Sequence, residues 1–109
     1  MTANIYVYCP ANEPGLSRCD LQEALEEFFG DAAEDVGAGS GIAGFNLDYE
    51  LADGEDPDQW ADRLCDFLRQ AGVRPSTVFE VFVDGWEPGM EWRRVEVFGS
   101  DRRLTKRGT

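Results

Sequence analysis

Apolar and polar residues alternate without a break between positions 45 and 51, and this is the clearest pattern in the chain. The apolar positions are Phe45, Leu47, Tyr49 and Leu51. The polar positions are Asn46, Asp48 and Glu50. A period of two predicts a strand that is buried on one face. Glycines crowd residues 37–44, so we expect a short strand near 34–38, a turn around Gly39–Gly41 and a long strand from Ile42 to Leu51.

Two segments show the apolar spacing of amphipathic helices. Ser17 is suited to cap the first helix and Gly30 to end it. The buried stripe of this helix is predicted to be Leu21, Ala24, Leu25, Phe28 and Phe29. Asp56 and Pro57 mark the start of the second helix, and Gly72 marks its end. The stripe of the second helix is predicted to be Trp60, Leu64, Phe67, Leu68 and Ala71.

Three further segments complete the predicted sheet, namely Ile5–Cys9, Thr77–Asp84 and Trp92–Phe98. The elements then follow the order strand, helix, two strands, helix, two strands. With right-handed crossovers, this order gives an α+β fold with an antiparallel sheet in the order 5-4-1-3-2 and both helices on one face. The first six elements resemble the βαββαβ order of a ferredoxin-like two-layer plait, extended by a C-terminal antiparallel strand. The resemblance lies in element order alone and implies no functional residue.

The length of 109 residues suits one domain, which we place at residues 1–100, followed by a basic, flexible tail at residues 101–109. The chain holds 22 acidic and 10 basic side chains, and its net charge is −12. Because four of the basic side chains lie in the tail, the body is more acidic than the whole chain. Such a body repels nucleic acids and anionic membranes and attracts basic proteins. A second interpretation is that the charge serves only solubility.

Several catalytic chemistries lack suitable residues in this sequence. The chain has no histidine, and its only lysine is Lys106 in the tail, so we predict neither an enzyme nor a cofactor. Residues 39–44 fit the pattern G-x-G-x-x-G, but a strand follows them instead of a helix, which favours a hairpin over a dinucleotide site. The acidic loop at residues 53–58 lacks the ligand order of an EF-hand, so we predict no metal.

The cysteines and the N-terminus bear on the compartment. The three cysteines, an odd number, show no metal-binding spacing and suit a reducing compartment better than a disulfide framework. The N-terminus lacks a basic segment followed by an apolar one. No apolar run approaches the ~18 residues that are needed to cross a bilayer. We therefore predict a cytoplasmic protein.

The face of the predicted sheet opposite the helices is the candidate binding site. It combines aromatic side chains with carboxylates, which suit contact with the arginine and lysine side chains of a partner. The predicted face consists of Tyr6, Tyr8, Asn46, Asp48, Glu50, Glu80, Phe82, Asp84, Trp92, Arg94 and Glu96. RNA-binding sheets also expose aromatic residues, but they are basic where this face is acidic, so nucleic acid is not the expected partner.

We therefore predict a small, acidic, non-enzymatic module that binds a basic protein partner, such as an inhibitor or an immunity protein. Two alternatives stay open. One is a small enzyme, or a ligand- or metal-binding protein, that uses the carboxylates of the sheet face. The other is a structural homodimer joined through the same face, in which the aromatic side chains are hidden.

Overall fold

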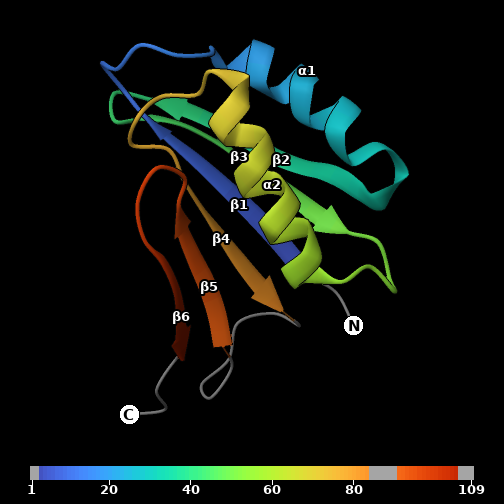
Figure 1. Ribbon diagram of the computed structural model, residues 1–109. Helices are drawn as coiled ribbons and strands as arrows, with labels where there is room; N and C mark the ends of the chain where they lie inside the picture. Colours follow the sequence, from blue (N-terminus) through green and yellow to red (C-terminus); the bar gives the residue numbers. More distant parts are fainter. Residues whose placement is uncertain (1–2, 84–90, 106–109) are drawn as a thin grey trace.

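One antiparallel sheet of six strands forms a layer of the molecule, and both helices lie over the same face of it (Figure 1). The structure is a computed structural model that describes residues 3–83 and 91–105. The strands follow the spatial order β2-β3-β1-β4-β5-β6, so that β1 is an inner strand. In chain order the elements are β1 (Ala3–Pro10), α1 (Arg18–Phe29), the short helix η1 (Gly30–Ala32), β2 (Ala33–Gly41), β3 (Gly44–Leu51), α2 (Pro57–Ala71), β4 (Val78–Val83), β5 (Glu91–Glu96) and β6 (Asp101–Thr105).

The predicted five-stranded plait is wrong, because a sixth strand extends the sheet. The expected ferredoxin-like plait had five strands in the order 5-4-1-3-2, whereas the sheet is a six-stranded one in a mostly-sheet α+β fold. The additional strand, β6, lies in the segment expected to be a flexible tail and pairs antiparallel with β5. Asp101 forms an ion pair with Arg93 of β5, and Arg103 forms one with Asp58 of α2. These contacts between charged side chains support a strand that has no apolar alternation. Residues 106–109 of the predicted tail lie outside the described residues.

Both helices begin where the sequence predicts. Ser17 Oγ accepts a hydrogen bond from the Asp20 amide at 3.2 Å and caps α1. Asp56 Oδ1 caps α2 in the same way and accepts from the Asp58 amide at 2.9 Å. These contacts satisfy amides that the first turn of a helix leaves without partners. Gly72 follows α2 with a left-handed φ of 84°, as expected for a glycine that ends a helix.

The hairpin between β2 and β3 turns later than predicted. The turn occupies Ile42 and Ala43, so β2 extends to Gly41, and both the turn at Gly39–Gly41 and the strand start at Ile42 are wrong. The decisive residue is Gly44, whose φ is 140°. A Cβ on Gly44 would lie 2.1 Å from the carbonyl oxygen of Cys9, so only glycine fits where the hairpin meets β1.

The core lies between the helix layer and one face of the sheet. The helices contribute their buried side chains Leu21, Leu25, Leu64 and Leu68. An aromatic cluster joins the two helices to β3 and consists of Phe28, Phe29, Tyr49, Trp60 and Phe67. The alternation between positions 45 and 51 is confirmed, since its apolar residues are all buried. Among the described residues, no helix lies on the other face of the sheet (Figure 1).

Candidate protein-binding face

Backbone pairing arranges the predicted site residues in rows that cross the strands on the helix-free side of the sheet. The central row is Asp48, Tyr6, Glu80 and Arg94, one from each of β3, β1, β4 and β5. The second row is Glu50, Asn4, Phe82 and Trp92. The third row is Asn46, Tyr8, Val78 and Glu96. We call these three rows the open face.

The structure thus brings the predicted residues together on one side of the sheet, apart from Asp84, which lies outside the described residues. The residues that alternate with them along the strands, such as Ile5, Val7 and Phe79, are buried on the helix side. Most side chains of the open face are half-buried rather than freely exposed. This is expected where neighbouring side chains pack across the strands.

Asp48 and Tyr6 form the electrostatically distinctive part of the open face. Burial raises the pKa of Asp48, a hydrogen bond with Asn4 opposes this shift, and the charge of Asp35 adds to it. The Asp48 Oδ1 atom is buried and makes no hydrogen bond within the described residues. Burial also raises the pKa of Tyr6, and neighbouring acidic side chains add to that shift. A half-buried carboxyl without an ion pair gains stabilisation when a partner places a positive charge beside it.

Glu80, by contrast, is already paired within the face. Trp92 Nε1 donates to Glu80 Oε2 at 3.0 Å, and Arg94 Nη1 lies 3.6 Å from the same oxygen. Phe82 stacks on Trp92, with ring centroids 6.5 Å apart and an interplanar angle of 19°. Glu80 therefore orients the aromatic pair, and Arg94 offsets its charge. Within the central row, Asp48 is therefore the carboxylate whose charge no cation of the row offsets.

Tyr8 has a structural contact in addition to its place on the open face. Its hydroxyl donates to the carbonyl oxygen of Ala43 at 2.9 Å, in the turn between β2 and β3. Asn46, its partner across the strands, lies against β2, because a Cβ on Gly39 would be only 2.9 Å from Asn46 Oδ1. Loss of Tyr8 would therefore disturb the hairpin as well as the face, so Tyr6 is the better probe of binding.

A hollow of about 340 Å³ adjoins the third row beside Glu96. Arg94 and Phe98 contribute to its lining. Phe98 is 54% exposed, and it extends the aromatic surface beyond the end of β5. The open face thus continues into a partly apolar hollow at this corner.

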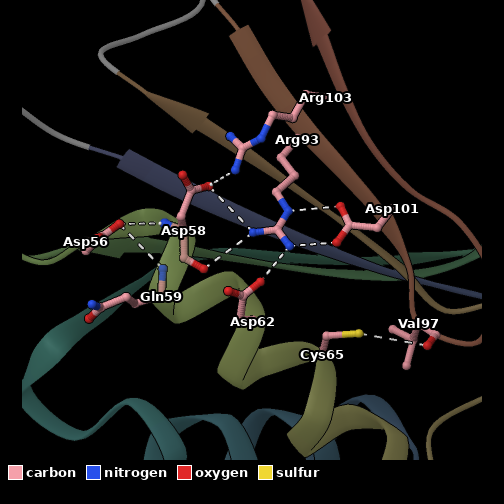
Figure 2. A network of polar contacts seen from close by, with 9 residues as sticks. All are labelled: Asp56, Asp58, Gln59, Asp62, Cys65, Arg93, Val97, Asp101 and Arg103. Atoms are coloured by element: carbon pink, nitrogen blue, oxygen red, sulfur yellow. Dashed lines mark hydrogen bonds and ion pairs between the residues drawn. The ribbon is translucent and has the colours of Figure 1, made fainter.

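Sequence reasoning missed an extensive polar network on the helix side of the sheet (Figure 2). Arg93 donates to both carboxylate oxygens of Asp101, at 2.9 and 2.6 Å, and to Asp62 Oδ1 at 2.6 Å. Asp58 Oδ1 lies 3.5 Å from the Arg93 guanidinium and 2.9 Å from that of Arg103. The hydrogen bonds with Asp101 raise the pKa of Arg93 and lower the pKa of Asp101. The network ties α2 to β5 and β6.

The sequence contained one signal for this network. Arg93 shares the alternation of Val95 and Val97, both of which are buried, so its side chain has to meet the helix layer. A charged group on a buried face requires partners. Asp58 and Asp62 are four residues apart in α2 and so lie on one side of it. We assign these charges a structural role.

The arrangement of the acidic and thiol side chains bears on metal binding and on thiol reactivity. Within residues 3–83 and 91–105, no three His, Cys, Asp or Glu side chains are grouped so that they could hold a metal ion. Burial raises the pKa of the Cys9 thiol and of the Cys65 thiol, which disfavours the reactive thiolate at both positions. None of the helices described has the length and apolar content needed to cross a bilayer.

Comparisons with known proteins offer no relative from which a role could be transferred. No protein-family model, no curated protein and no solved structure matches the chain. The geometry and charge of the open face are therefore the guide to its role.

Proposed function

We propose that this protein is an acidic protein-binding module whose open face binds a basic protein. The observation that carries the proposal is the environment of Asp48. Its half-buried carboxyl lies opposite Tyr6 in the central row, and its Oδ1 has no hydrogen bond within the described residues. An arginine or lysine of a partner supplies the positive charge that this half-buried carboxyl lacks.

Aromatic side chains near Asp48 provide contact area for such a partner. Tyr6 is its neighbour across the strands, and the stacked Phe82 and Trp92 belong to the adjacent row. Tyrosine and tryptophan dominate the binding energy of many protein interfaces. Arginine also stacks on aromatic rings, whereas lysine binds mainly as a point charge. The open face therefore suits an arginine-rich surface better than a lysine-rich one.

Long-range electrostatics favour the same class of partner. The net charge of −12 attracts basic proteins and speeds their encounter at low salt. Glu50 and Glu96 stand at the ends of their rows and add negative charge at the rim of the face. A small acidic protein that covers the basic site of a partner inhibits that partner. An inhibitor of the immunity-protein type is the role that we propose.

The test is to capture the partner and to reconstitute the complex. Wild-type protein and the variant Asp48→Asn are immobilised and exposed to an extract of the source cells. The substitution keeps the shape of the side chain and removes its charge. The matched control is Glu27→Gln, which neutralises an exposed carboxylate on α1 in the helix layer. Each captured protein is then purified, and its affinity for the three proteins is measured across a salt series.

We expect a basic protein that binds wild type and the Glu27→Gln control equally and binds Asp48→Asn about tenfold or more weakly. Its affinity should fall as salt screens the charges. A partner that binds Asp48→Asn as tightly as wild type, or an affinity that ignores salt, contradicts the proposal. Self-association that this substitution abolishes would support the homodimer instead.

A further inference from the structure

We infer that the free edge of β2 completes the binding site, and that it binds an extended basic segment of the partner as an additional strand of the sheet. The inference rests on the proposed function, because it specifies how the basic partner docks beside the open face.

β2 is an outer strand with one unpaired backbone edge. Among the described residues it pairs only with β3. Gly41 and Gly44 are paired at the closing turn, and hydrogen-bonded and non-bonded pairs alternate along an antiparallel ladder. The amide and carbonyl groups of Ala38 and Ser40 therefore point away from β3. They present donors and acceptors with which an added strand can pair.

The features that commonly protect an edge strand are missing from the second half of β2. Such edges are blocked by proline, by lysine or by a bulge. β2 contains no proline and no lysine, and its bulge lies early, between Asp35 and Gly37. From Gly37 to Gly41 the register runs without a shift. The opposite outer strand, β6, carries Arg102 and Arg103 instead.

Exposed apolar side chains flank this unprotected stretch. In the described part of the chain, the exposed large apolar residues are Val36, Ile42 and Phe98. Val36 is 45% exposed at the bulge, and Ile42 is 99% exposed in the turn. They therefore stand at the two ends of the stretch from Gly37 to Gly41. Each side chain offers apolar contact area to a segment that pairs with the edge between them.

The charge around the edge selects a basic occupant. At the start of β2, a hollow of about 310 Å³ has three carboxylates in its lining, those of Asp31, Glu34 and Glu50. Further along, Gly37 lies opposite Asp48 and places no side chain between Asp48 and the edge. An added strand would run about 9.5 Å from β3, which is two strand spacings. An arginine on that strand can span this distance and meet Asp48.

These constraints define the occupant as an extended segment of roughly five residues, the length of the open stretch, with arginine or lysine at alternate positions. Alternation directs those side chains to one face of the sheet, the open face. A second copy of this chain is not the expected occupant, because two bodies that each carry a net charge of −12 repel one another.

The test uses two substitutions at Ser40, whose amide points out of the sheet. Ser40→Pro removes that donor and leaves the ladder to β3 intact, because proline is tolerated where the amide faces solvent. Ser40→Ala removes the hydroxyl and keeps the amide, so it is the matched control. Circular dichroism and thermal unfolding establish that both variants fold. A displayed library of random heptapeptides is then selected on the wild-type protein.

We expect the selected peptides to carry arginine or lysine at alternate positions and to bind Ser40→Pro about tenfold or more weakly than wild type. They should bind Ser40→Ala as they bind wild type. In the complex, hydrogen exchange should slow at the amides of Ala38 and Ser40. Selection of no peptide, peptides without basic residues, equal binding to Ser40→Pro or unchanged exchange at both amides each overturn the inference.

The same variants separate this inference from the proposed function. A partner whose affinity falls with Asp48→Asn and not with Ser40→Pro binds the open face, and strand addition is then overturned. A partner sensitive to Ser40→Pro alone supports strand addition and contradicts the role of Asp48. A wild-type dimer that becomes monomeric with Ser40→Pro would place a second copy at the edge and overturn the basic occupant.

Discussion

Arg93 and Asp101 lie on the adjacent strands β5 and β6 and are joined by two hydrogen bonds of 2.9 and 2.6 Å. The same guanidinium reaches Asp62 of α2 at 2.6 Å. The Arg93 side chain is only 11% exposed, whereas that of Asp101 is 46% exposed. The last strand is therefore held to the helix layer by a nearly buried cation on β5, in addition to the direct ion pair between Arg103 and Asp58.

Replacing Arg93 should weaken the fold more than replacing its exposed neighbour. Arg93→Met keeps the stem and removes the charge, so Asp101 and Asp62 lose a hydrogen-bond donor and Asp58 loses an ion-pair partner. We expect the free energy of unfolding to fall by about 1–3 kcal/mol. Arg103→Met is the matched control, since Arg103 is 53% exposed and should cost less than about 1 kcal/mol. Urea unfolding followed by circular dichroism measures both, and equal losses would contradict this role for Arg93.

The pair also makes stability depend on acid pH. Arg93 holds the pKa of Asp101 below its ordinary value, which is about 4. The stabilisation is therefore present above the ordinary pKa and is lost as the pH falls through the lowered folded-state pKa. Wild-type protein should lose stability between about pH 4 and pH 2. Arg93→Met should lose less over this range in the same urea experiment, and parallel curves would argue against the pairing.

Asp48 should show the opposite dependence, because its pKa is raised in the folded state. Its charged form is disfavoured by folding at neutral pH, so Asp48→Asn should raise the melting temperature at pH 7. The gain should shrink as the pH falls through the raised folded-state pKa and should vanish below about pH 4. Because the same substitution is expected to weaken binding, a more stable variant that binds less tightly excludes unfolding as the cause. A lower melting temperature at pH 7 would contradict the unsatisfied environment of Asp48.

Two glycines of the β2–β3 hairpin should respond very differently to the same substitution. Gly44→Ala should cost about 3 kcal/mol or more, because φ is 140° and the new Cβ would lie 2.1 Å from the carbonyl oxygen of Cys9. Gly41→Ala meets no atom within 4 Å and should change stability by about 0.5 kcal/mol or less. Thermal unfolding of both variants checks the contrast, and similar costs would place the constraint elsewhere in the hairpin.

On the open face, binding should depend more on Tyr6 than on the indole nitrogen of Trp92. Tyr6→Ala removes an aromatic side chain beside Asp48 and should cost about 2 kcal/mol of binding. Trp92→Phe keeps a ring against Phe82 and loses the donor to Glu80, so about 1 kcal/mol or less is expected. Titration calorimetry with the reconstituted partner gives both values. The reverse order would move the centre of the interface from Asp48 to Trp92.

The helix starts and the buried side of β3 could be predicted because each depends on residues close in sequence. Ser17 caps an amide three residues ahead, and the alternation that begins at Phe45 needs no distant partner. β6 could not be predicted in this way. Its stabilising contacts are with Arg93, which in turn contacts α2. The sequence of β6 shows no apolar alternation that would predict a strand. The turn was misplaced because several glycines suggested a turn, whereas the close approach to β1 occurs only at Gly44.

The open face could be predicted as a set of residues but not as an arrangement. Alternation assigns Tyr6, Asp48 and Glu80 to one side, but only the register places Tyr6 between the two carboxylates. The pairing of Glu80 with Trp92 and Arg94 likewise depends on how β4 meets β5. Without that register, Glu80 would be counted among the carboxylates that are free to bind a partner.

The inner position of β1 has a consequence for folding during synthesis. Tyr8 pairs with Asn46 of β3 on one side and with Val78 of β4 on the other. The first strand to leave the ribosome therefore cannot be paired on both edges until β3 and β4 have been synthesised. The β2–β3 hairpin can form early, because its contacts are close in sequence. Until β4 emerges, one edge of β1 stays open beside an incomplete core. The nascent chain is therefore most vulnerable to aggregation just before its sheet closes at the centre, and it is at this stage that a chaperone would protect it best.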